Sequence, residues 1–304
     1  MNLVGILALF KARIGLYFSF ILAPFFFLQA NEECTVSHVH KYKVHDSVEE
    51  RTYMDVTLDC GKNGEALFTI SLPEKIPPEG LPCYLIVGGL KTGKESLQFI
   101  PDHGNYALVA YEYSDMLKKL HQVNVLWHLY TVRKAALEVP PELIGIIKYL
   151  YKQPWINPDP ISLMGYSFGA TYMPVTYVKA EEEGLKLGPG VLCYGGAGIY
   201  CLFKANLPLP NFLKDPVASM AAALFKPIDP IFYAPKMHGE FLILNGIYDV
   251  QIPMKCASRL QELVPEPKTI MNLETEHMHP KSLELNLKLI NISRKWLDEK
   301  RRAL

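Results

Sequence analysis

Short apolar runs separated by longer helical stretches constrain the fold of this chain more than any other feature. The runs lie at residues 83–87 (CYLIV), 106–111 (YALVAY), 161–164 (ISLM), 191–194 (VLCY), 241–244 (FLIL) and 269–273 (TIMNL). Strands of this kind are typically buried on both faces, inside a mainly parallel sheet. The sequence therefore predicts an α/β protein with helices on both faces of the sheet.

The segment before these runs has the pattern of antiparallel strands. Residues 35–45 alternate apolar and polar side chains, as a half-buried strand does, and residues 53–60 and 66–72 continue the pattern around a glycine-containing break. Residues 127–151 have helical spacing, and Pro140 and Pro141 predict a break within that helix. Residues 195–235 contain six prolines and little charge, which predicts a small cap-like insertion with helices of its own.

The N-terminal 30 residues have the composition of a targeting segment. Lys11 and Arg13 precede an apolar stretch at residues 14–28, and the small residue Ala30 follows it. This order predicts a signal peptide over residues 1–30, which leaves residues 31–304 as a single domain. A retained signal-anchor and a buried helix are the alternatives. The expected location is secreted or periplasmic, or membrane-anchored and facing outside the cytoplasm.

Charge and cysteine content exclude several classes of function. Thirty-one basic residues balance thirty-one acidic ones, so no surplus of positive charge is available for nucleic-acid binding. The six cysteines form no CxxC pair, which argues against a structural zinc site. In an oxidising compartment Cys34 could pair with Cys60, and Cys193 with Cys201 is a second possibility; we expect at most one bridge.

Residues 165–169 (GYSFG) form the motif that carries chemistry. An apolar run leads directly into it and a helical stretch leads directly out, which predicts a strained strand-to-helix turn with Ser167 at its tip. A serine hydroxyl at such a turn is exposed at the carboxyl edge of the sheet, above a helix N-terminus that favours developing negative charge. Ser167 is therefore the predicted nucleophile.

A serine nucleophile needs a base and an acid that orients it. Asp249 follows the run at 241–244, and 28 residues later His277 follows the run at 269–273, so both are expected at the same sheet edge as Ser167. His279 is the competing base, but it precedes Pro280, where we expect the last helix to begin. The pair His277 and His279 could also ligate a metal, as could the cluster His38, His40 and His45. The second group alternates along a strand with no nearby carboxylate cluster, and no metal is expected at either group.

A tetrahedral intermediate requires two backbone N–H donors for its oxyanion. The first expected donor is Phe168, directly after the nucleophile. The second is Leu90, which follows Gly88 and Gly89 after the run at 83–87.

With these residues in place, the chain resembles the α/β-hydrolase superfamily over about residues 50–300. The resemblance rests on residues 87–90 (VGGL), 165–169 (GYSFG), Asp249 in GIYDVQIP and His277 in TEHMHP. Residues 228–235 (IDPIFYAP) are similar to the dienelactone-hydrolase, serine-peptidase and FrsA-like esterase branches. Members usually carry His-Gly where this chain has Gly88-Gly89, so the support of that loop differs here.

The resemblance implies hydrolysis of a small-molecule acyl substrate, a carboxylic ester, thioester or small amide, through an acyl-enzyme and without metal or organic cofactor. A serine aminopeptidase, an acyltransferase and a non-catalytic binding protein on the same scaffold are the alternatives. The expected partners are the acyl substrate and, in the alternative of a retained signal-anchor, a membrane that the N-terminal segment would enter. No nucleic acid is expected, and the sequence carries no prediction of the oligomeric state.

Overall fold

The computed structural model describes residues 33–45, 49–100, 102–119 and 128–302. The signal peptide expected over residues 1–30 lies outside these ranges. Within them, no helix has both the length and the apolar character needed to span a bilayer.

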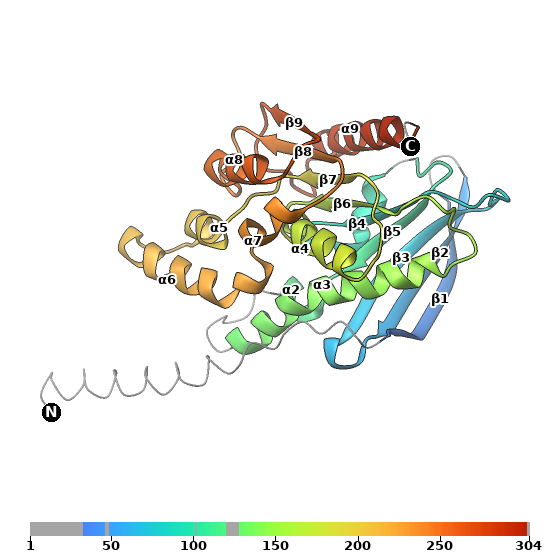
Figure 1. The fold of residues 1–304 in the computed structure, drawn as a ribbon, viewed down its shortest axis with the longest axis horizontal. Helices are drawn as coiled ribbons and strands as arrows, with labels where there is room; N and C mark the ends of the chain where they lie inside the picture. The colour runs from blue at the N-terminus through green and yellow to red at the C-terminus, as the bar shows by residue number, and fades with distance from the viewer. Residues whose placement is uncertain (1–32, 46–48, 101, 120–127, 303–304) are drawn as a thin grey trace, which may run out of the picture. The chain divides into compact units, whose positions relative to one another are not determined.

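A mixed sheet organises the described residues (Figure 1). Its nine strands lie in the order β1-β2-β3-β5-β4-β6-β7-β8-β9 within the described part of the chain. Strands β1 to β3 and the β3–β5 pair are antiparallel, whereas β5, β4, β6, β7, β8 and β9 run parallel. The strands are β1 (Thr35–His45), β2 (Glu50–Asp59), β3 (Glu65–Pro73), β4 (Cys83–Val87), β5 (Ala107–Glu112), β6 (Ser162–Tyr166), β7 (Gly190–Cys193), β8 (Phe241–Gly246) and β9 (Lys268–Leu273).

Helices cover both faces of this sheet. Alternate side chains of the central strands pack on α3, α4 and α8 on one face, and on α9 and η2 on the other. The α-helices are α2 (Asp115–Lys118), α3 (Leu129–Tyr151), α4 (Phe168–Glu182), α5 (Ile199–Asn206), α6 (Asn211–Leu224), α7 (Pro230–Tyr233), α8 (Met254–Leu263) and α9 (Leu283–Arg301). The 3₁₀ turns are η1 (Gly61–Asn63), η2 (Gly93–Phe99), η3 (Lys226–Ile228) and η4 (Ala234–Lys236). This arrangement confirms the predicted fold class.

The two edge strands differ from the prediction. Strand β1 was expected to be half-buried and β9 buried on both faces, but most side chains of β1 are exposed, and so are Ile270 and Met271 of β9. Each of these strands is paired on one side only, so apolar composition alone does not bury it.

The predicted break at Pro140 and Pro141 is wrong. Helix α3 continues through both prolines, which are themselves buried. The lost backbone N–H donors weaken the helix at this point, but Val139, Leu143 and Ile147 pack into the core around them. Tertiary packing therefore overrides the local preference.

Two disulfides are present where at most one was expected. Cys34 pairs with Cys60, as the sequence suggested, but Cys201 pairs with Cys256 rather than with Cys193. Cys193 ends β7, between β6 and β8, and is buried with a free thiol, whereas Cys201 lies on α5 and is bonded to Cys256.

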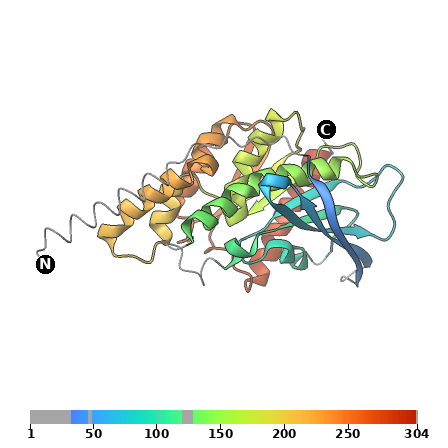
Figure 2. The same ribbon diagram turned by 90° about the horizontal axis from the view of Figure 1, so that it is seen from below.

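Residues 195–235, the expected insertion, contain the helices α5, α6 and α7. Figure 2 shows α5 and α6 next to each other, at the opposite end of the domain from β1. Asp229 caps α7, because its carboxylate accepts a hydrogen bond from the backbone N–H of Ile231.

Candidate active site

Ser167 lies at the turn between β6 and α4. Its backbone has φ 52° and ψ −114°, a region that residues other than glycine rarely adopt. The backbone N–H of Ser167 donates to the carbonyl of Cys193 at 2.8 Å, which ties the turn to the neighbouring strand β7. Strain of this kind persists at a site only when its surroundings hold it in place.

The glycines on either side of Ser167 are required by close packing. A Cβ on Gly169 would lie 1.9 Å from the carbonyl oxygen of Val87, and one on Gly165 would lie 2.3 Å from Cγ of Met173. The first of these clashes is with backbone that cannot move aside easily. The GxSxG spacing is therefore a steric requirement of this turn.

His277 and Asp249 complete a continuous hydrogen-bonded series with Ser167. His277 Nε2 lies 2.8 Å from Ser167 Oγ, and His277 Nδ1 lies 2.6 Å from Oδ2 of Asp249. The three residues follow β6, β8 and β9, and parallel strands place their carboxyl ends at one edge of the sheet. All three predicted residues therefore meet in space.

Asp249 is held on its second oxygen by backbone groups. Its Oδ1 accepts hydrogen bonds from the N–H groups of Gln251 and Ile252, both at 2.8 Å. The side chain of Asp249 is 1% exposed and that of His277 is 8% exposed. A buried, immobilised carboxylate fixes the orientation of the imidazole and favours its protonated form when a proton arrives.

His279, the competing base, makes local contacts instead. Its Nδ1 accepts from the N–H of Lys281 at 3.1 Å, and its carbonyl accepts from Ser282 N–H and from Nδ2 of Asn286. Helix α9 begins at Leu283, so the expectation that Pro280 opens it is wrong by three residues. The residues between Pro280 and Leu283 form a turn that His279 stabilises.

The two expected oxyanion donors lie beside the nucleophile. Leu90 and Phe168 line the same cavity as Ser167, and a Cβ on Gly89 would lie 3.9 Å from Cβ of Ser167. Among the described residues, no acceptor for the N–H of either Leu90 or Phe168 is found. Both residues therefore lie where the sequence predicts the oxyanion donors, in the wall of the cavity that contains Ser167.

Tyr113 supports this loop from below, and sequence reasoning missed it. Its hydroxyl donates to the carbonyl of Gly88 at 2.7 Å, and its ring packs on Phe168 with the ring centroids 5.5 Å apart. Tyr113 is 1% exposed, so water does not compete for that hydrogen bond. One buried side chain thus contacts both halves of the expected oxyanion site.

Tyr194 packs against the imidazole from the end of β7. Its ring lies edge-on to His277 with centroids 5.5 Å apart, and its hydroxyl hydrogen-bonds to Thr275. Tyr194 has φ 55°, the second positive value among the described non-glycine residues. Burial raises the pKa of Tyr194 to about 12, so it stays neutral beside the base. A positive φ at this position leaves no signal in the sequence.

A cavity of about 700 Å³ opens at Ser167 and His277. Its walls come from the glycine loop, η2, α5, α9 and the loops that carry Gln251 and His277. Most lining side chains are aliphatic or aromatic, and none of those described is an aspartate or glutamate. Among the described residues, no group of three or more His, Cys, Asp or Glu side chains is arranged to hold a metal ion.

Comparison with solved structures identifies the fold. An acetyl xylan esterase from Paenibacillus sp. R4 superposes with a TM-score of 0.60 at 15% identity, covering 84% of this chain and 88% of that one. Acetyl xylan esterase 1 from Thermoanaerobacterium sp. JW/SL YS485 gives 0.58 at 14% identity, over 86% and 91%. The acylaminoacyl peptidase of Pyrococcus horikoshii gives 0.59 at 12% identity, over 88% of this chain and 56% of that one.

These similarities show that the chain has the α/β-hydrolase fold. No protein-family model and no curated protein sequence matches the chain. At such low identities the fold is shared, whereas the reaction must be argued from the site.

Proposed function

We propose that this protein is a serine hydrolase that cleaves a carboxylic ester, thioester or small amide through an acyl-enzyme. The observation that carries the proposal is the continuous series from Ser167 Oγ through His277 to the buried Asp249, at the wall of an apolar cavity. A structural serine would not need a strained backbone, a flanking pair of sterically required glycines and a free pair of N–H donors beside it.

The proposed reaction follows from this geometry. Ser167 Oγ attacks the carbonyl carbon while His277 Nε2 takes its proton, and Asp249 stabilises the imidazolium that forms. The N–H groups of Leu90 and Phe168 receive the negative charge on the tetrahedral oxygen. His277 then returns the proton to the leaving group, and water reverses the sequence to release the acid.

The cavity favours an ester or thioester over an aminopeptidase substrate. A free α-ammonium group requires a carboxylate or several acceptors to replace its water. No aspartate or glutamate lines the cavity among the described residues, and its walls are mostly apolar. An uncharged acyl group therefore suits this site better than the N-terminus of a peptide.

We also propose export, with residues 1–30 as a signal peptide. Two disulfides support it, because such bridges form and persist mainly in oxidising compartments. A membrane-anchored form would expose the same domain to the same compartment.

Turnover of a p-nitrophenyl ester by matched serine variants tests the proposal. Ser167→Ala removes the nucleophile and should lower kcat by on the order of 10⁶. Ser162→Ala, on strand β6 before the same turn, removes a buried hydroxyl that has no hydrogen-bond partner among the described residues, and it should retain turnover. Ser167→Ala with most of the wild-type activity would contradict the assignment.

The same assay separates the two histidines. His277→Ala should be nearly as inactive as Ser167→Ala, and the double variant little worse than either single one, because the residues act as a unit. His279→Ala should lose less than about tenfold, since the hydrogen bonds of His279 join its own turn to the first turn of α9 and none of them reaches Ser167 or Asp249. An active His277→Ala beside an inactive His279→Ala would move the base by two residues.

A further inference from the structure

One face of α5 forms a wall of the cavity. Ile199, Leu202, Phe203 and Asn206 all line it, and their spacing of three, four and seven residues places them on the same side of a helix. Three of the four side chains are apolar. Tyr200 and Lys204, which lie on the other side of the helix, are exposed.

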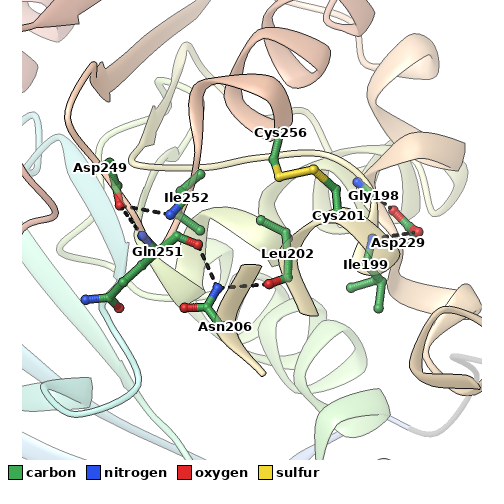
Figure 3. The surroundings of a disulfide bond; sticks show 10 residues. All are labelled: Gly198, Ile199, Cys201, Leu202, Asn206, Asp229, Asp249, Gln251, Ile252 and Cys256. Atoms are coloured by element: carbon green, nitrogen blue, oxygen red, sulfur yellow. Dashed lines mark hydrogen bonds between the residues drawn. A yellow bond between two sulfur atoms is a disulfide. The ribbon is translucent and has the colours of Figure 1, made fainter. Parts of the chain in front are cut away.

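Three connections hold α5 at its start, middle and end (Figure 3). The carboxylate of Asp229 accepts from the N–H groups of Gly198 at 3.2 Å and Ile199 at 3.0 Å. The Cys201–Cys256 disulfide joins the middle of α5 to the first turn of α8. These two connections fix the helix before its apolar face meets a ligand.

The third connection reaches the loop of the catalytic acid. Asn206 Nδ2 donates to the carbonyl of Gln251 at 2.7 Å, and the N–H of Gln251 donates to Oδ1 of Asp249. Figure 3 shows these residues on neighbouring segments, with Asn206 between Gln251 and Leu202. Helix α5 is therefore connected by hydrogen bonds to the loop that carries Asp249.

The other residues that line the cavity indicate what it accepts. Leu90, Phe99, Ile100 and Ile290 line it, and Lys91 is the one lysine or arginine among the described lining residues. A carbohydrate needs many hydrogen-bond partners, and an acetyl group alone would leave most of about 700 Å³ unfilled. An aliphatic chain fills such a space and buries apolar surface on both sides.

We propose that the face of α5 formed by Ile199, Leu202 and Phe203 binds the aliphatic chain of an ester several carbons long, and that the Cys201–Cys256 disulfide holds this wall in place. The inference rests on the proposed hydrolase function and names its substrate class. Each CH₂ that enters the cavity should raise kcat/KM about fourfold, which corresponds to about 0.8 kcal/mol of transfer free energy.

Two ester series test the substrate class on the wild-type protein. In p-nitrophenyl acetate, butyrate, hexanoate and octanoate the chain is on the acyl side, and in ethyl, butyl and hexyl acetate it is on the alcohol side. A rise of about fourfold per CH₂ up to six carbons in either series supports the proposal and identifies the side that α5 contacts. If acetate and ethyl acetate are the best substrates of their series, the proposal is overturned. If the wild-type protein turns over none of these esters and a fluorophosphonate does not label Ser167, the proposed hydrolase function itself is contradicted.

Matched variants test the wall and its disulfide through the ratio of kcat/KM for hexanoate to that for acetate. Phe203→Ala should lower this ratio about tenfold, whereas Tyr200→Ala, on the exposed face of the same helix, should leave it unchanged. The double variant Cys201→Ala/Cys256→Ala should also lower the hexanoate-to-acetate ratio about tenfold. The double variant Cys34→Ala/Cys60→Ala, which removes the disulfide near β1 and β2, should leave this ratio unchanged.

Circular dichroism at the assay temperature controls for unfolding of each pair. If the paired variant at Cys201 and Cys256 does not fold, Phe203→Ala still decides whether α5 contacts the chain. Equal ratios in Phe203→Ala and Tyr200→Ala would overturn the role of α5. A folded paired variant at Cys201 and Cys256 with the wild-type ratio would overturn the role of the disulfide.

Discussion

The carboxylate of Asp249 divides its two oxygens between two tasks. Oδ1 accepts from two backbone N–H groups, which fixes the side chain, and Oδ2 accepts from Nδ1 of His277, which fixes the imidazole. The geometry of the base therefore depends on a turn of four residues rather than on side-chain packing alone. Asp249 begins this turn three residues after β8 ends at Gly246, so the sheet places the proposed acid near its edge.

At the same scale, Tyr113 offers a test of the oxyanion loop. Tyr113→Phe removes the hydrogen bond to the Gly88 carbonyl, so we expect kcat to fall about tenfold with KM changed less than about threefold. Tyr172→Phe is the matched control, because Tyr172 also packs on Phe168, at 5.3 Å, but its buried hydroxyl has no hydrogen-bond partner among the described residues. Equal kcat values for the two variants would show that the loop does not depend on Tyr113.

The roles that the sequence reveals are those tied to strand ends. Ser167, Asp249 and His277 each follow an apolar run. Because these strands run parallel, the three residues lie at the same edge of the sheet although they are distant in the sequence. Tyr113 was not predicted because its hydroxyl contacts a loop 25 residues away in the sequence. Gln251 was not predicted because it acts through its backbone N–H and carbonyl, which no local sequence pattern encodes.

Among the elements, α3 carries a buried acid near its two prolines. Glu142 is 5% exposed, and the hydroxyl of Tyr111 donates to its carboxylate. Burial raises the pKa of Glu142 to about 8 from its ordinary value of 4.5. The folded protein therefore keeps this proton at pH values where the unfolded chain has released it.

This shift predicts a pH dependence of the free energy of unfolding. Between about pH 5 and pH 8 the folded state binds more protons than the unfolded state, so Glu142 should lower stability as pH rises, by about 1.4 kcal/mol per pH unit at most. Glu142→Gln keeps an acceptor for Tyr111 and removes the titration. Urea unfolding at several pH values should show the variant gaining about 3 kcal/mol of stability relative to the wild type between pH 5 and pH 7.5, with no further change below about pH 4. Parallel stability curves for the two proteins would contradict this account.

The positions of the strands along the chain could be predicted from the sequence, but the burial and the neighbours of each element could not. All nine strands of the described chain begin and end within a few residues of the patterns that predicted them. The exposure of β1 and β9, the continuity of α3 and the Cys201–Cys256 pairing all depend on which elements lie side by side. That information arises only when the whole sheet has formed.

For the whole molecule, the proposed export predicts a shortened N-terminus. Cleavage after Ala30 predicts that the mature protein begins at Asn31. N-terminal sequencing of the protein isolated from its native host checks this directly. Recovery of an intact form beginning at Met1 in the membrane fraction would contradict cleavage and favour the anchor.

Ser167 is proposed to be an activated nucleophile. The residue on which a fluorophosphonate forms a covalent adduct is the most direct test of this role. A fluorophosphonate reacts only with a serine whose proton a neighbouring base removes. After reaction with the wild-type protein, peptide mass mapping should find one phosphonyl group per chain, on the peptide that contains Ser167, and none in Ser167→Ala. An adduct on another residue, or undiminished labelling of Ser167→Ala, would contradict the account.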